Sequence, residues 1–189
     1  MRFWRAAALA AGFVTALCAQ AGATVVARAS IADLRDEATH VVHARVVDRA
    51  VVPTFGPRGE IRTRTTLRVL TYLKGAGPAT LTVQQLGGTL DGLTMHVEGN
   101  ARLEPGDEVV AFLDVDAMAD LAYVVGLAQG VWHVDRTPGA LRVARDLEGL
   151  AFYRAGAVEV TYDDPPLTLT ELWAAIGVDA PAADGAVGR

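Results

Sequence analysis

Apolar residues recur at helical spacing in two short segments of the chain, one near each end. In the first segment, Ser30 precedes the apolar positions and Asp33 follows three residues later, which is the pattern of a capping box. In the second, Thr168 and Glu171 repeat this spacing, and a glycine follows the last apolar position. We therefore expect a short N-terminal helix and a C-terminal helix. Their apolar faces consist of Ile31, Leu34 and Ala38 in the first, and Leu169, Leu172, Trp173 and Ile176 in the second.

Between these helices, short apolar runs alternate with polar residues or are bounded by glycine, proline and aspartate, which is typical of β-strands. A turn from Pro53 to Gly59 separates the two longest runs. In the second of them, Arg62, Arg64 and Arg68 share the polar side, so we expect a half-buried strand. The expected strands span residues 40–52, 60–73, 79–86, 107–115, 121–127, 130–136 and 140–146.

The number and spacing of these strands favour a β-sandwich or a closed barrel. The sequence contains no internal repeat and no interdomain linker, so we expect one domain over residues 24–178. Residues 179–189 lack apolar periodicity, and we expect them to form a disordered tail.

The first 23 residues have the three parts of a secretory signal peptide. Arg2 and Arg5 give a basic start, Ala6–Ala19 an apolar run, and residues 21–23 a small-residue cleavage site. The apolar run is shorter than the roughly 20 residues that span a bilayer. We expect cleavage after Ala23 and a secreted or periplasmic protein with no membrane span, an uncleaved anchor being the alternative.

Removal of the expected signal peptide would also change the cysteine content of the chain. Cys18 is the only cysteine and lies within the expected signal peptide. A lipoprotein signal needs a small residue before the cysteine, whereas Leu17 stands there, so lipidation of Cys18 is the lesser alternative. The processed chain would therefore have no disulfide, no thiolate metal ligand and no thiol nucleophile.

The charge of the chain argues against a nucleic-acid partner. The sequence has 17 basic and 22 acidic residues, and removal of Arg2 and Arg5 leaves 15 against 22, a net charge of −7. Nucleic-acid binding normally relies on an excess of basic residues. Trp132 is also the only tryptophan expected in a strand, so a row of stacking aromatic residues is not indicated.

A glycine-rich stretch, residues 87–106, raises the possibility of a phosphate-binding loop. Such a loop leads into a helix, but the residues after its first two glycines have strand-like composition. Pro105 and Gly106 instead predict a type II turn between strands. His96 and Glu98 match the first half of a zinc deaminase motif, which needs cysteines that the processed chain lacks.

Four histidines could in principle meet at a metal ion. His40 and His43 are three residues apart, so on an extended strand they would point to opposite faces. We expect His96 and His133 in later strands. The candidate metal ligands are therefore His40, His43, His96 and Glu98, and we expect no metal and no other cofactor.

The remaining candidates for chemistry have simpler interpretations. Three aspartates in residues 114–120 could offer calcium ligands, but Met118 and Ala119 depart from the EF-hand pattern, so we expect solvated loop acids. Ser30 is the only serine and is best used as a helix cap. Lys74 lies in an expected turn with no apolar pocket. We therefore expect no covalent catalysis.

The order of several motifs resembles that of bacterial secreted proteins of unknown function. The similar pieces are a helix-then-strand opening, a strand ending in Leu-Lys-Gly, a paired-glycine strand with a turn and strand, and a closing hairpin. The resemblance implies an OB-like or small-barrel fold, and it carries no catalytic residue. Where that pattern has proline and phenylalanine in the turn, this chain has Ala101 and Leu103. The matching segments are residues 29–47, 66–75, 86–113 and 123–134.

Together, pattern and resemblance predict a mainly β protein: a single OB-like, closed antiparallel β-barrel with a short N-terminal helix and a C-terminal helix. We expect an exported, non-catalytic module that binds a protein, peptide or glycan in the envelope or outside the cell. The alternatives are an envelope metal-dependent hydrolase that uses His96 and Glu98 with other histidines, or an inhibitor or accessory factor of a secreted protease. The expected contact residues in the loops are Phe55, Arg58, Asp91, Met95, His96 and Asn100.

Overall fold

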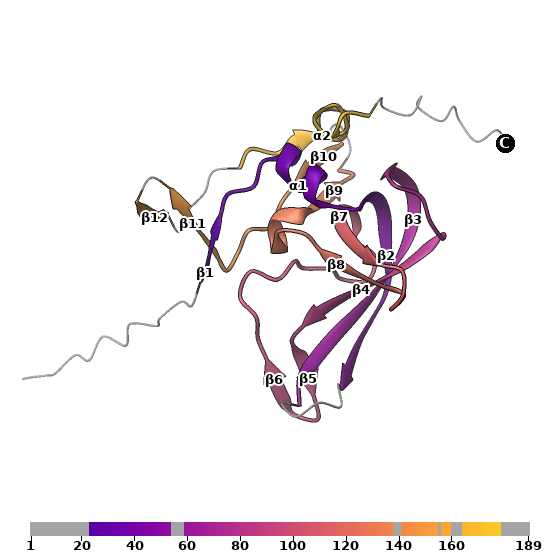
Figure 1. Ribbon diagram of the computed structural model, residues 1–189, viewed down its shortest axis with the longest axis vertical. Helices are drawn as coiled ribbons and strands as arrows, with labels where there is room; N and C mark the ends of the chain where they lie inside the picture. The colour runs from indigo at the N-terminus through magenta and orange to yellow at the C-terminus, as the bar shows by residue number, and fades with distance from the viewer. Residues whose placement is uncertain (1–22, 54–58, 138–140, 155, 160–163, 179–189) are drawn as a thin grey trace, which may run out of the picture.

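A computed structural model of the protein describes residues 23–53, 59–137, 141–154, 156–159 and 164–178 (Figure 1). Strands dominate these residues and two α-helices accompany them, so the expected mainly β fold is confirmed. Residues 1–22 of the expected signal peptide and all of the expected tail, 179–189, lie outside the described residues, and both stay predictions.

The largest sheet has eight strands, in the order β13-β10-β9-β7-β2-β3-β4-β8. Its two longest strands are β2 (His40–Pro53) and β3 (Ile61–Lys74), which confirm the two long strands expected from the sequence and pair antiparallel along their length. The other members are β4 (Thr80–Leu86), β7 (Glu108–Asp116), β8 (Leu121–Val124), β9 (Val131–Asp135), β10 (Arg142–Ala144) and β13 (Leu167–Thr168).

Strand β8 has two neighbours in this sheet. It pairs antiparallel with β7 and parallel with β4. The pairings therefore lead from β2 through β3, β4, β8 and β7 and return to β2. The inward side chains of these strands form one hydrophobic core, whose buried members include Val42, Val46, Leu67, Val83, Val109 and Leu113.

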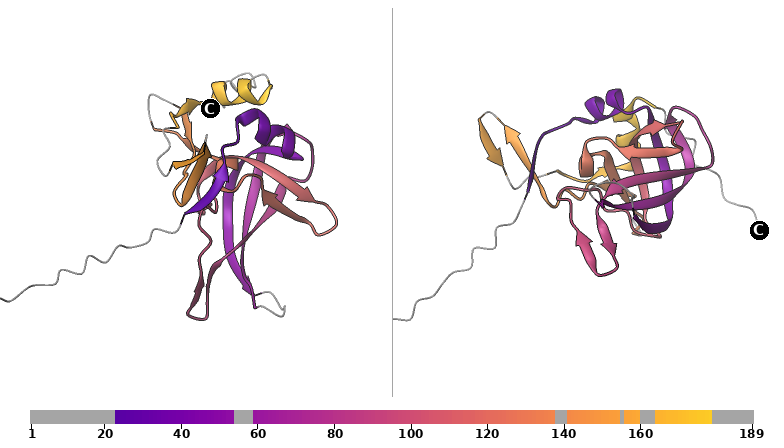
Figure 2. Two further views of the ribbon diagram at one scale, coloured as in Figure 1. Left: turned by 60° about the vertical axis from the view of Figure 1, so that its left-hand side comes forward. Right: turned by 60° about the horizontal axis from the view of Figure 1, so that its bottom comes forward.

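Both helices cover the outside of this sheet at one end, where they lie side by side (Figure 2). Each of α1 (Ile31–Glu37) and α2 (Leu169–Ile176) begins with the expected capping box, and Gly177 ends α2 in a left-handed conformation. The expected apolar faces pack against outward residues of β2, β7 and β9. This second core contains Leu34, Val41, Val110, Phe112, Trp132, Leu172, Trp173 and Ile176.

Lys74, at the end of β3, stabilises the C-terminal end of α1. Its Nζ donates hydrogen bonds to the carbonyl oxygens of Arg35 and Ala38, each at 2.6 Å. The last carbonyls of a helix have no partner within the helix, and a cation at that end also interacts favourably with the helix dipole. The only lysine of the chain therefore fixes the position of α1 on the sheet.

A second sheet was not expected from the sequence. Strand β1 (Thr24–Ala27) pairs parallel with β11 (Leu150–Arg154), which pairs antiparallel with β12 (Ala157–Glu159). One side of this sheet contributes Leu150 and Phe152 to a small core, which also includes Ala128 of the 3-10 helix η1 (Leu127–Gly130). In Figure 1, β11 and β12 project from the side of the molecule.

The glycine-rich stretch contains a hairpin where one strand was expected. Strands β5 (Gly88–Leu90) and β6 (Leu93–Met95) are joined by Asp91 and Gly92, both with positive φ. An Asp-Gly pair favours this tight turn. His96 therefore follows β6 in a loop, and its expected place in a strand is wrong. The expected turn at Pro105-Gly106 is confirmed, with Gly106 at φ 99°.

None of the described helices is long and apolar enough to cross a bilayer.

Candidate functional site

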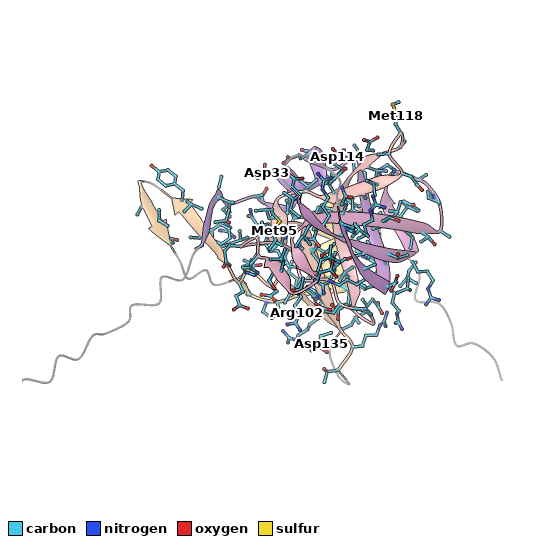
Figure 3. All side chains as sticks on the ribbon, turned by 90° about the horizontal axis from the view of Figure 1, so that it is seen from below. Asp33, Met95, Arg102, Asp114, Met118 and Asp135 are labelled. Atoms are coloured by element: carbon cyan, nitrogen blue, oxygen red, sulfur yellow. The ribbon has the colours of Figure 1, made fainter. Side chains whose placement is uncertain are left out.

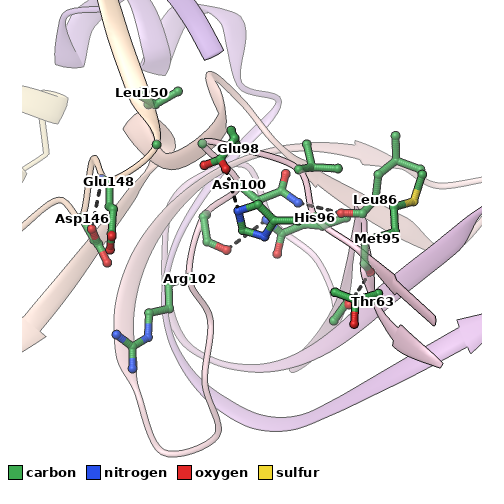
Figure 4. A pocket seen from close by; sticks show the side chains of 18 of the residues that line it. Thr63, Leu86, Met95, His96, Glu98, Asn100, Arg102, Asp146, Glu148 and Leu150 are labelled. Carbon is green, nitrogen blue, oxygen red and sulfur yellow. Dashed lines mark hydrogen bonds and ion pairs between the residues drawn. The ribbon is translucent and has the colours of Figure 1, made fainter. Parts of the chain in front are cut away.

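A cleft of about 910 Å³ opens where the ends of β2, β3 and β4 meet the β5–β6 hairpin (Figure 4). Val51 and Thr63 line it from the two long strands. The loop after β6, residues 96–102, lines a second side, and residues 146–150 line a third. The cleft thus combines residues that lie far apart in the sequence.

Side-chain hydrogen bonds hold the lining of the cleft in place. Thr63 Oγ1 donates to the carbonyl oxygen of Gly87 at 2.8 Å, and Asn100 Nδ2 donates to the carbonyl oxygen of Leu86 at 2.6 Å. Each bond satisfies a backbone carbonyl near the end of β4. The amide nitrogen of Asn100 is therefore engaged in fixing the loop.

Two glycines allow the loops of the cleft to touch. Gly99 and Gly149 both have positive φ, at 79° and 78°. A Cβ atom at Gly149 would lie 2.6 Å from Glu98 Oε2, and one at Gly99 would collide with Leu150. Thr24 Oγ1 also donates to the carbonyl oxygen of Glu98 at 2.8 Å. A side chain at Gly149 would also lie 2.8 Å from the backbone nitrogen of Gly99, so it would push the two walls apart.

The side chains of His96 and Glu98 contact each other in this cleft, with Nε2 and Oε1 3.1 Å apart. The His96 side chain is 72 % exposed and that of Glu98 is 38 % exposed. Exposed pairs contribute little to stability, about 0–1 kcal/mol. Both groups are therefore free to exchange their mutual contact for contacts with a ligand.

The structure brings together three of the six expected contact residues. Met95, His96 and Asn100 line the cleft. Asp91 occupies the tip of the β5–β6 hairpin and is not part of the lining. Phe55 and Arg58 lie outside the described residues.

The other candidate metal ligands lie apart from this pair. His40 packs edge-on against Tyr72, and its Nε2 lies 3.2 Å from the carbonyl oxygen of Ala76. His43 is buried against Glu108, with Nε2 2.8 Å from Oε1. Within the described part of the chain, no three or more His, Cys, Asp or Glu side chains converge in an arrangement suited to a metal ion.

His133 lies in β9, as expected, and its acidic partner is Asp107 rather than Glu98. Its Nδ1 is 3.8 Å from Asp107 Oδ2. Burial lowers the pKa of His133, and the nearby carboxylates of Asp107 and Asp146 oppose that change. This imidazole is thus disposed to remain neutral at physiological pH.

Among the three aspartates of residues 114–120, Asp116 serves local structure. Asp116 Oδ1 accepts hydrogen bonds from the backbone nitrogens of Met118 and Ala119, which builds the turn between β7 and β8. Met118 is fully exposed at this turn, away from the cleft (Figure 3). A further aspartate, Asp164, forms a two-bond ion pair with Arg145 at 2.6 and 2.8 Å.

Glu108, which contacts three basic side chains, is not among the candidates expected from the sequence. Its carboxylate accepts hydrogen bonds from Arg136 and Arg45 and contacts His43, although its side chain is only 5 % exposed. The hydrogen bonds from Arg136, then those from His43 and Arg45, lower the pKa of Glu108 to about 2 against the opposing effect of burial. Its partners come from β2 and from the end of β9, so no local motif marks it.

No family model, curated protein or solved structure matches this chain. The resemblance to bacterial secreted proteins therefore stays a prediction.

Proposed function

We propose that this protein is an exported, non-catalytic module that binds a protein, peptide or glycan segment in its cleft. The observation that carries the proposal is the convergence of Met95, His96 and Asn100, expected from the sequence as contact residues, on one cleft. Aliphatic side chains such as Val51 and Leu150 line it beside polar ones. A lining of this kind suits a ligand that has both apolar surface and hydrogen-bonding groups.

We infer that the scaffold of this module is an OB-like closed barrel. The return of the strand pairings from β7 to β2, through a parallel β4–β8 pair, supports this inference. OB-folds are five-stranded Greek-key barrels that bind polymers on their strands and loops. Export is supported by the three-part sequence of residues 1–23, and β1 begins at Thr24, directly after the expected cleavage position.

Peptide and glycan arrays probed with the purified protein would test the binding proposal. We expect hits whose signal falls in a His96→Ala variant, since this exposed imidazole can contact a ligand directly. Met118→Ala is the matched control, because Met118 is fully exposed outside the cleft and its signal should not change. Hits that are insensitive to His96→Ala, or no hits at all, would contradict a cleft-binding module.

The hydrolase alternative is favoured by one observation, the pairing of His96 with Glu98 inside the cleft. Elemental analysis of the purified protein distinguishes the two functions. Stoichiometric zinc that is lost in His96→Ala would replace the binding proposal by metal-dependent chemistry. The inhibitor alternative rests on fold analogy and stays a prediction.

A further inference from the structure

The outward side of β3 carries a row of arginines flanked by hydroxyl side chains. Ile61, Thr63, Thr65 and Leu67 point inward and are buried, so the alternate residues face solvent. Arg64 and Arg68 are exposed, and Arg62 is half buried. On the paired strands, Arg45 of β2 lies directly opposite Arg68, and Thr80 and Thr82 of β4 lie opposite Arg68 and Thr66. We call Arg45, Arg62, Arg64 and Arg68 the arginine face.

Only the ends of the arginine face are neutralised by ion pairs. Glu60 pairs with Arg62 at 2.8 Å, and Glu108 pairs with Arg45 at 3.0 Å. Among the described residues, no ion pair joins Arg64 or Arg68 to a carboxylate; Arg64 donates instead to the neutral Gln84 amide at 3.3 Å. The centre of the face therefore holds two arginines that lack an acidic partner in the described part of the chain.

The face is basic although the chain is acidic. Arg136 also pairs with Glu108, so five arginines lie in this region. The nearby carboxylates are those of Glu60, Glu108 and Asp48, which lies opposite Thr66, so the local charge is +2. The whole chain has a net charge of −5. Arg45 and Arg68 also stand directly opposite across the strand pair, where like charges repel. A bound anionic group between them would remove that repulsion.

We propose that the arginine face binds a linear anionic glycan along β3, independently of the cleft. Guanidinium groups bind carboxylate and sulfate oxygens through paired hydrogen bonds. Arg64 and Arg68 are four residues apart on one strand, about 13 Å along its axis, so they would contact successive charged groups of a chain. The threonine hydroxyls beside them can bind sugar hydroxyls.

The shape and charge of the surroundings favour a single thin chain over other anions. The outward positions between Arg62 and Arg68 are occupied by Arg64 and Thr66, so no aromatic ring is available there for stacking on nucleobases. A membrane or duplex would also approach the acidic remainder of the molecule and be repelled by it. A flexible glycan can follow the basic strand alone.

Binding of the purified protein to dextran sulfate and to polygalacturonate, with neutral dextran as a blank, would test this proposal. We expect salt-sensitive binding that is weakened about tenfold in Arg64→Gln/Arg68→Gln, which removes two exposed charged contacts. Arg64→Lys/Arg68→Lys should retain most of the affinity. The matched control, Arg28→Gln/Arg142→Gln, removes the same charge from exposed positions outside both the arginine face and the cleft, and it should bind like the parent protein.

Several results would overturn the proposal. One is equal weakening in both glutamine pairs, which would indicate an effect of net charge and not of the arginine face. Another is no binding to either anionic glycan. Tighter binding to oligo-dT or to phosphatidylglycerol vesicles than to the glycans would assign the face to nucleic acid or to a membrane. Thermal unfolding of each variant confirms that any loss is not a loss of fold.

Discussion

Replacement of Glu108 by glutamine should remove a large, pH-dependent part of the stability of this protein. The pKa of Glu108 lies at about 2 instead of 4.5, because Arg136, His43 and Arg45 donate to its carboxylate. Each pKa unit corresponds to about 1.4 kcal/mol, so the charged form stabilises the fold by about 3 kcal/mol at neutral pH. Glu108→Gln keeps the size of the side chain, removes its charge and replaces one of its two acceptor oxygens by an amide donor.

The pH window follows from the direction of that change. The pKa of Glu108 is lower in the folded than in the unfolded state, so its contribution is complete above about pH 4.5 and is lost as the pH falls toward 2. Urea unfolding, monitored by the fluorescence of Trp132 and Trp173 at pH 7, 4 and 2.5, measures the contribution of Glu108 to the free energy of unfolding. We expect Glu108→Gln to be about 3 kcal/mol less stable at pH 7, with a difference from the parent protein that narrows as the pH falls.

Glu37→Gln is a suitable control, since it removes one negative charge from an exposed position on α1. Its unfolding free energy should stay within about 0.5 kcal/mol of the parent protein at pH 7. The reasoning fails if Glu108→Gln keeps the same pH slope as the parent protein between pH 4.5 and 2.5. That result would mean that its partners do not stabilise the charged carboxylate in the folded state.

Two further predictions concern the other charged contacts of the sheet. Lys74→Met removes both hydrogen bonds to the end of α1 and should lower the free energy of unfolding by about 1–2 kcal/mol. Urea unfolding measures this change. An unfolding free energy equal to that of the parent protein would show that these contacts contribute nothing to stability. Arg68→Gln relieves the repulsion with Arg45 and should raise stability at low salt by roughly 0.2–0.5 kcal/mol, a gain that disappears in 1 M salt. A gain that is independent of salt, measured by thermal unfolding, would rule out the electrostatic explanation.

Local sequence patterns predict much of the main sheet and both helices. Ser30 and Thr168 start the helices as expected, because a capping box satisfies backbone donors with residues only three positions away. The alternation of arginine with buried residues in β3 likewise depends only on the two-residue period of a strand. The Asp91-Gly92 hairpin was missed although its signal is local and strong.

The features that could not be predicted depend on contacts between distant residues. The carboxylate of Glu108 meets His43, which is 65 positions away, and no spacing rule links them. The cleft forms because loops around Glu98 and Gly149 touch, although these residues are 51 positions apart and no local pattern links them. In contrast, Met95, His96 and Asn100 could be chosen together because they share one glycine-rich loop region.

The parallel pairing of β1 with β11 has a consequence for the order of folding. Thr24 aligns with Leu150, so the two strands can meet only after the 125 intervening residues have been synthesised, which include seven strands of the main sheet. Contacts between such distant residues carry a large loop-closure cost until the intervening chain is compact. The first strand of the protein should therefore be among the last to dock, and one wall of the cleft should be completed only at that late step.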